Sequence, residues 1–226
     1  LLALPHDSLR RDLEAILLNC MAKTCDGITE EMWKDDDTFE AINAVTLLTE
    51  VGNDDSSLDT LLEMLRQPSE TFEFFFGDYL VETFIMPLYA LGKNKLDKLM
   101  DFFKEEGLCG FSKTAVFAVV EHIDKLQPGR HKETTEWMRE AIRFATEKLP
   151  EAQYIDSLTA GFIASCCADI KMMELLPELK EMFATGLVDT DITVDYDDVA
   201  AQMHSKEDYF INYVQPDIYE QFDNFK

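Results

Sequence analysis

Clusters of basic residues are missing from this chain of 226 residues. Lys and Arg together number 20 against 45 Asp and Glu, which gives a net charge of -25. Nucleic-acid backbones and anionic lipid surfaces attract groups of Lys and Arg. The composition therefore argues against a nucleic-acid partner and against docking on a membrane surface, and it permits a basic protein partner.

Paired cysteines are missing as well. The chain has five cysteines, an odd number, and no two of them form a C-x-x-C pair. Cys166 and Cys167 are neighbours in a predicted helix, where adjacent side chains diverge by roughly 100°. This pattern excludes a disulfide framework and a zinc-finger site. Free thiols in a reducing compartment explain it, and they predict a cytoplasmic location.

Long hydrophobic runs are also absent from the sequence as it reads. We see no apolar stretch close to the roughly 20 residues that a membrane span needs. The opening residues LLALPHDSLRRDL lack the basic start and the long apolar centre of a signal peptide. We therefore expect no membrane partner.

Catalytic signatures do not occur. There is no Gly-rich phosphate loop, no G-x-S-x-G and no H-E-x-x-H, and the four histidines are scattered. An EF-hand loop beginning at Asp189 would place Val194 where glycine is needed and Ala200 where glutamate is needed. We instead expect Asp195 or a neighbour to cap a helix that begins near Tyr196. The sequence predicts no catalytic residue, no cofactor and no metal site.

Amphipathic segments of helical period fill residues 78–185. The segments at 112–126 and 154–170 are more apolar than their neighbours, which predicts inner helices. Alternate segments begin near 56, 94, 132 and 173, and the others near 36, 74, 112 and 154, a spacing typical of two-helix repeats. The pattern predicts an all-α fold, a HEAT-like α-α superhelix built as a short right-handed solenoid of helix pairs. A compact α-bundle is the alternative.

Charged residues from Glu136 to Glu147 recur three and four positions apart, which indicates an ion-paired, solvated helix face. We expect residues 1–203 to form a single helical-repeat domain. Residues 204–226 form an acidic, aromatic C-terminal tail that is predicted to pack back on the final helices as a cap. The rings expected to do so are Tyr209, Phe210, Tyr213, Tyr219 and Phe222, while Asp217, Glu220 and Asp223 face solvent. A free docking peptide is the alternative.

Residues 174–199 are the most distinctive stretch in the chain. They contain Leu176-Pro177-Glu178, then Gly186-Leu187-Val188-Asp189, then the acidic-aromatic segment Asp195 to Val199. Together with Ile85 to Gly92 upstream, they resemble a bacterial family of helical-repeat proteins, the domain of unknown function 1186. The resemblance covers about residues 36–203 and implies a HEAT-like fold without indicating an activity. Some relatives end in a cysteine-rich metal-binding appendage, whereas no cysteine follows Cys167 here.

A non-enzymatic protein-interaction scaffold is the function that these patterns favour, with a protein partner bound on a concave face of the inner helices. The polar positions expected on that face are Asp78, Glu82, His122, Lys125, Asp156 and Asp169. One alternative is an acidic decoy or inhibitor that binds a basic protein surface. Another is a hydrolase with acidic residues between the repeats. The sequence leaves the oligomeric state open.

Overall fold

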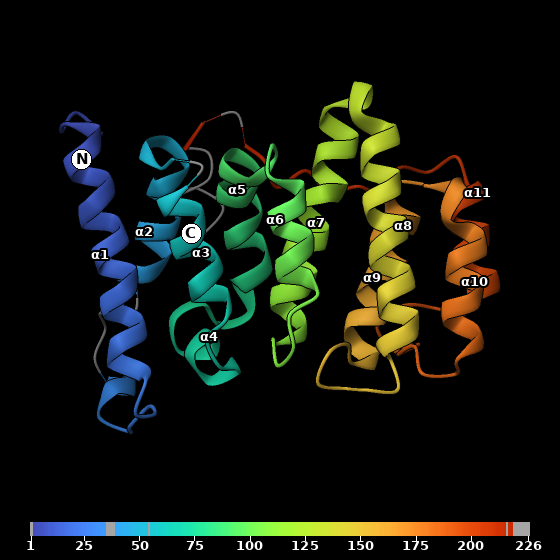
Figure 1. Ribbon diagram of the computed structural model, residues 1–226, viewed down its shortest axis with the longest axis horizontal. Helices are drawn as coiled ribbons and strands as arrows, with labels where there is room; N and C mark the ends of the chain where they lie inside the picture. The colour runs from blue at the N-terminus through green and yellow to red at the C-terminus, as the bar shows by residue number, and fades with distance from the viewer. Residues whose placement is uncertain (1, 35–38, 54, 216, 219–226) are drawn as a thin grey trace. The chain divides into compact units, whose positions relative to one another are not determined.

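The computed structural model describes residues 2–34, 39–53, 55–215 and 217–218, and in these ranges the chain forms helices and no strand. The predicted all-α fold is confirmed (Figure 1). Contacts divide the chain into two compact units. The first holds the described residues up to Lys95 and those from Tyr213 onward, and the second spans Leu96–Asn212.

The first unit is built from five α-helices among the described residues. They are α1 (His6–Thr24), α2 (Phe39–Val51), α3 (Ser56–Leu65), α4 (Ser69–Phe76) and α5 (Leu80–Gly92), with short 3-10 turns at Met32–Lys34 and Gly77–Tyr79. Helix α1 packs on α2 and α3, and α5 packs on the same two helices. Leucines and a phenylalanine at their contacts are fully buried, including Leu17, Leu48, Leu61 and Phe84. Burial of these side chains is the main stabilising contribution to this unit.

One apolar stretch of the first unit corrects an expectation from the sequence. Residues Ser69–Gly92 are long and apolar enough to cross a membrane by length and composition. The expectation that no stretch approaches this length was wrong, because the apolar part of this stretch contains only Asp78 and Glu82 as charged residues, and they do not lower its mean hydropathy enough. In the structure the stretch bends at Gly77, which has φ +52, and 61% of its apolar window is buried in the protein. A buried core helix of a water-soluble protein has the same properties.

The second unit places six further α-helices in two packed rows. They are α6 (Leu96–Phe103), α7 (Gly110–Leu126), α8 (His131–Lys148), α9 (Ser157–Asp169), α10 (Leu176–Ala184) and α11 (Tyr196–His204), with 3-10 turns at Pro128–Arg130 and Met173–Leu175. Helix α8 packs on α6, α7 and α10, while α9 packs on α7 and α11 (Figure 1). Asp195 is the N-cap of α11 and accepts a hydrogen bond of 3.0 Å from the Asp198 N–H, as the sequence predicted.

Helix α7 is the most deeply buried element of this unit. Every residue from Ser112 to Asp124 is buried. On α9 the alanines 160, 164 and 168 are at most 1% exposed, so that small side chains let the neighbouring helices approach closely. The burial of these two helices agrees with their apolar composition.

The C-terminal segment is described only in part. After α11 the chain from Ser205 to Asn212 forms no regular secondary structure, and the Phe210 ring packs on His122 of α7. Tyr209 is 39% exposed and Asp217 is exposed. Tyr219, Glu220, Phe222 and Asp223 lie outside the described residues. The boundary at residue 203 and the capping role of the tail stay predictions.

Candidate functional site

A surface on the second unit gathers three of the six residues that the sequence singled out. It is formed by His122 and Lys125 near the end of α7, Asp169 at the end of α9, and Lys171 directly after α9. We call this surface the α7–α9 face. The extended segment 205–212 and Gln202 of α11 lie over it, so the structure brings these residues together and covers them with its own chain.

Two lysines hold the covering segment. The Lys171 Nζ donates a 2.8 Å hydrogen bond to the Ser205 carbonyl oxygen. The Lys125 Nζ lies 3.5 Å from the Asp208 Oδ1 and 5.5 Å from the centre of the Phe210 ring. Because both amines are cationic, they can recognise a chain through its carbonyl groups, its carboxylates and its aromatic faces.

Lys171 has an unusual backbone conformation. Its φ of 58° is the left-handed region, and it is the non-glycine residue with positive φ in the described chain. This conformation follows the end of α9, where glycine is the usual choice because a side chain raises the energy by about 1 kcal/mol. A lysine at this position gives up some stability and gains a contact to segment 205–212.

His122 forms the apolar floor of the α7–α9 face. Its side chain is 1% exposed, and its ring centre lies 4.8 Å from that of Phe210. The Nδ1 lies 2.7 Å from the Ala118 carbonyl oxygen, which can only accept, so Nδ1 carries the proton. Burial lowers the pKa of the imidazole, against the opposing effect of hydrogen bonds to the backbone of Ala118 and Ile211. The ring is neutral at pH 7 and serves as a packing surface.

Two acidic groups with raised pKa values lie in or directly beside the face, and the sequence reasoning missed the first of them, Glu121. Burial raises the pKa of Glu121, which is 6% exposed, to about 8, while a hydrogen bond from the Cys166 thiol opposes that rise. Burial also raises the pKa of Asp169 to about 6, and the Gln202 Nε2 donates a 2.9 Å hydrogen bond to its Oδ1. An acidic residue inside the apolar run AVFAVVEHI was the available signal for Glu121.

The Glu121–Cys166 pair has the chemistry of a packed protein interior. Burial and the nearby Glu121 carboxyl raise the pKa of the Cys166 thiol well above its usual value. A reactive cysteine needs the opposite, a lowered pKa beside cationic groups. Glu121 and Cys166 are therefore both uncharged at neutral pH, and the pair does not form an activated nucleophile.

The other three predicted residues take different roles. Asp78 is exposed in the turn Gly77–Tyr79, and Glu82 is half-buried on α5, both in the first unit. Asp156 is the N-cap of α9, and its Oδ1 accepts hydrogen bonds from the Thr159 N–H at 2.7 Å and the Thr159 hydroxyl at 2.6 Å. Its carboxylate stabilises the helix start.

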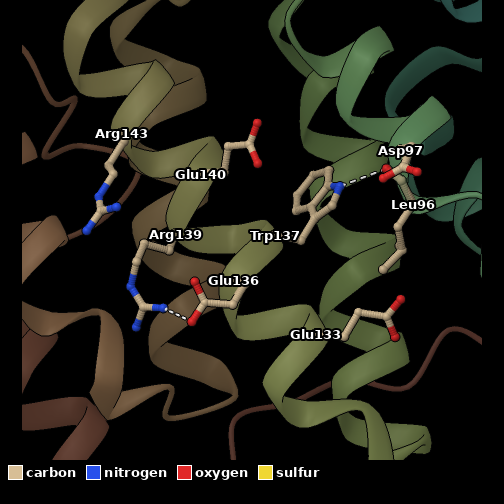
Figure 2. A pocket seen from close by; sticks show the side chains of 8 residues that line it. All are labelled: Leu96, Asp97, Glu133, Glu136, Trp137, Arg139, Glu140 and Arg143. Atoms are coloured by element: carbon tan, nitrogen blue, oxygen red, sulfur yellow. Dashed lines mark hydrogen bonds and ion pairs between the residues drawn. The ribbon is translucent and has the colours of Figure 1, made fainter.

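A separate pocket of about 390 Å3 opens between α6 and α8. Figure 2 shows the residues that line it, which are Leu96, Asp97, Glu133, Glu136, Trp137, Arg139, Glu140 and Arg143. The Trp137 indole N–H donates a 3.0 Å hydrogen bond to the Leu96 carbonyl oxygen and fixes the ring against the pocket. From the sequence, the charged residues of α8 were interpreted as a solvated helix face. Their helical spacing cannot show that a pocket lies beside them.

Most charges of the pocket are in ion pairs, largely with residues outside its lining. Glu178 of α10, which is 8% exposed, accepts from the Arg139 Nε at 3.0 Å and from the Arg143 guanidinium at 2.9 Å through the same oxygen. The Arg139 guanidinium also binds Glu136 at 2.6 Å. Glu133 and Glu140 pair with Arg130 and Lys104. Asp97 is the pocket carboxylate for which the described residues provide no ion pair.

The described residues contain no group of three or more His, Cys, Asp and Glu side chains arranged to hold a metal ion. The geometry of the second unit is thus that of a packed helical body, with one face covered by an extended segment and one open charged pocket.

Comparison with known proteins gives a family and no activity. No curated protein and no solved structure matches the chain. The family described as protein of unknown function (DUF1186) matches residues 8–225, which is nearly the whole sequence and extends beyond the 36–203 that the resemblance had covered. The chain belongs to this family.

Proposed function

We propose that the protein is a non-enzymatic interaction scaffold of the HEAT-like type, a short right-handed superhelix of stacked helix pairs that binds a protein partner. The α7–α9 face is its binding surface. Five free cysteines are consistent with a reducing, cytoplasmic location, which is part of the same proposal.

The stacking is supported by the order of contacts in the second unit. Helices α6, α8 and α10 follow one another as neighbours, and so do α7, α9 and α11, while α7 also packs on α6 and α8. Consecutive members of each row begin between 35 and 47 residues apart, close to the 40–47 residues of HEAT and armadillo units. This alternation is what stacked helix pairs produce.

One observation carries the binding function: the α7–α9 face already holds an extended chain. The face contacts segment 205–212 through the backbone of Ser205, the carboxylate of Asp208 and the ring of Phe210. Surfaces that bind extended chains use this combination of main-chain, charged and apolar contacts. An enzymatic role has less support, because Cys166 and Glu121 are uncharged at neutral pH and Asp156 is used as a helix cap.

The test is retention of a partner on the immobilised full chain from extracts of the cells that make it. The variant carries Lys125→Glu and Lys171→Glu, which reverse both positive charges of the α7–α9 face. A matched control is Lys132→Glu, at an exposed lysine of α8. We expect the retained protein to be lost with the double variant and kept with the control. Equal retention by all three proteins would exclude the α7–α9 face as the binding surface.

A second candidate is an acidic surface that engages a basic protein. The observation in its favour is the pocket of Figure 2, where Asp97 has a carboxylate without an ion pair in the described residues. Because exposed charges are screened by salt, binding of this kind falls steeply between 50 and 500 mM salt, about tenfold or more. Loss of the partner with Asp97→Lys, and retention with the Lys125/Lys171 double variant, would favour this candidate.

A further inference from the structure

We infer that the α7–α9 face recognises an extended peptide in which an acidic residue stands two positions before an aromatic one, and that segment 205–212 is an intramolecular occupant that a partner of the same chemistry displaces. The inference rests on the proposed function and narrows the partner to an acidic-aromatic segment.

Recognition of the backbone requires an extended ligand. Lys171 binds the carbonyl oxygen of Ser205, and the His122 ring bonds to the backbone of Ile211, six residues further along. Between these two points the chain has no regular secondary structure. A helical ligand would keep most of its carbonyl groups in its own hydrogen bonds, so the face selects an extended chain.

The acidic position is set by Asp208. Its Oδ1 accepts a 3.3 Å hydrogen bond from the Phe210 N–H and lies 3.5 Å from the Lys125 Nζ. The hydrogen bond between the Asp208 side chain and the Phe210 N–H is a local turn, and it directs the chain so that the Phe210 ring reaches its position on the face. The Phe210 N–H and the positive charge of Lys125 both lower the pKa of this carboxyl, which keeps it ionised. Lys125 therefore favours a carboxylate at this position of a ligand.

The aromatic position is set by Phe210. Its ring packs between the imidazole of His122 and the amine of Lys125, at 4.8 and 5.5 Å from its centre. A neutral imidazole in contact with the ring and a cation over it suit a flat aromatic side chain. An aliphatic side chain would lose the contact with the cation.

The occupant is held loosely enough to exchange. Glu207, Asp208, Tyr209 and Ile211 are exposed, and Ile211 reaches 63%, whereas His122 beneath them is 1% exposed. Segments with few buried contacts open at low free-energy cost. Tethering gives segment 205–212 an effective concentration of about millimolar, so a free peptide competes poorly until the tether's contacts are weakened.

Fluorescence polarisation with a labelled peptide of residues 203–213 tests the inference on the full chain. Phe210→Ala weakens the internal occupant, and Asp208→Lys does so at an exposed side chain with little risk to folding. Tyr209→Ala is the matched control, because the hydrogen bonds of its hydroxyl are to Glu207 and Ser205, both within the segment itself. We expect the first two variants to bind the peptide at least tenfold more tightly than the unaltered chain, and the control to match the unaltered chain.

Exchanging the two charges of the Lys125–Asp208 pair tests whether this contact holds the peptide. Adding Lys125→Glu to the Phe210→Ala chain, whose internal occupant stays weakened, removes peptide binding, and a peptide carrying Lys at position 208 restores it. Equal peptide binding by the unaltered, Phe210→Ala and Asp208→Lys chains would overturn the inference. If the Lys125/Lys171 double variant loses the cellular partner while no variant binds the peptide, the scaffold function stands and the acidic-aromatic class of ligand is wrong.

Discussion

The carboxyl of Glu121 on α7 accepts a hydrogen bond from the thiol of Cys166 on α9. Burial raises the pKa of that carboxyl from 4.5 to about 8, so a glutamate at the centre of the second unit is protonated at neutral pH. Asp169 and Lys125 supply the charges nearest to it, with opposite effects on its pKa. The helix pair is therefore joined through an uncharged polar contact whose state depends on pH.

Stability should depend on this group between pH 4.5 and about 8. In that range the folded protein binds a proton at Glu121 that the unfolded chain has released, so the free energy of unfolding falls as pH rises. Glu121→Gln removes the ionisation and should flatten the decline of the melting temperature between pH 5 and 8. At pH 8.5 the variant should be at least as stable as the unaltered chain. Glu181→Gln, at an exposed position of α10, should keep the original slope. An unchanged slope in the Glu121 variant would contradict the assignment.

Lys113 should contribute to stability as a buried cap. It is 1% exposed, and its amine donates to the Phe103 carbonyl oxygen and, at 2.6 Å, to the Glu105 carbonyl oxygen at the end of α6. Lys113→Met keeps the apolar stem and removes the donors, which leaves these carbonyls without them and should cost about 1–3 kcal/mol of stability. Urea unfolding measures the change. Lys132→Met on the exposed face of α8 should change the stability little, and equal effects of the two substitutions would contradict the capping role.

Two glycines, Gly110 and Gly129, differ in how closely neighbouring atoms approach them. A Cβ at Gly110, the start of α7, would lie 2.6 Å from the Thr159 hydroxyl and 3.0 Å from an Asp156 carboxylate oxygen, whereas a Cβ at Gly129 would have no neighbour within 4 Å. Gly110→Ala should therefore displace the cap of α9 and cost about 1–3 kcal/mol. Gly129→Ala should be neutral or slightly stabilising. Thermal melts that move equally for both would show that the contact at Gly110 relaxes without cost.

Divalent metals should leave the melting temperature unchanged. The failed EF-hand alignment at Val194 and Ala200, and the lack of a ligand cluster in the described residues, give calcium, magnesium and zinc no site that favours the folded state. Melts with each ion at micromolar to millimolar concentration check this. A saturable rise of several degrees with one ion would reveal a site.

The helices could be predicted because apolar residues recur along the sequence with the period of an α-helix. Segments expected to begin near 94, 132 and 173 are found as α6 from Leu96, α8 from His131, and the turn before α10 from Met173. The burial of α7 followed from its apolar composition. Each of these features depends on neighbours three or four positions apart, which the sequence displays directly.

Features that join distant parts of the chain were not predictable. His122, Lys125 and Asp169 were expected on one face and do come together, but nothing in their spacing shows that segment 205–212 covers them. The contact of Phe210 with His122 of α7 depends on the direction in which the chain leaves α11. The pocket beside Trp137 depends on how α6 packs on α8. Local periodicity carries no information about either relationship.

The covering segment also has a consequence for synthesis. Asp208 is 83 residues further along the chain than its partner Lys125. At translation rates of about 5 to 20 residues per second, helix α7 leaves the ribosome roughly 4 to 17 s before the residues that cover it. During this interval the floor of the α7–α9 face around His122 is open to chaperones, to other nascent chains and to its eventual partner. A partner that is present during translation would thus meet the face before its internal competitor exists.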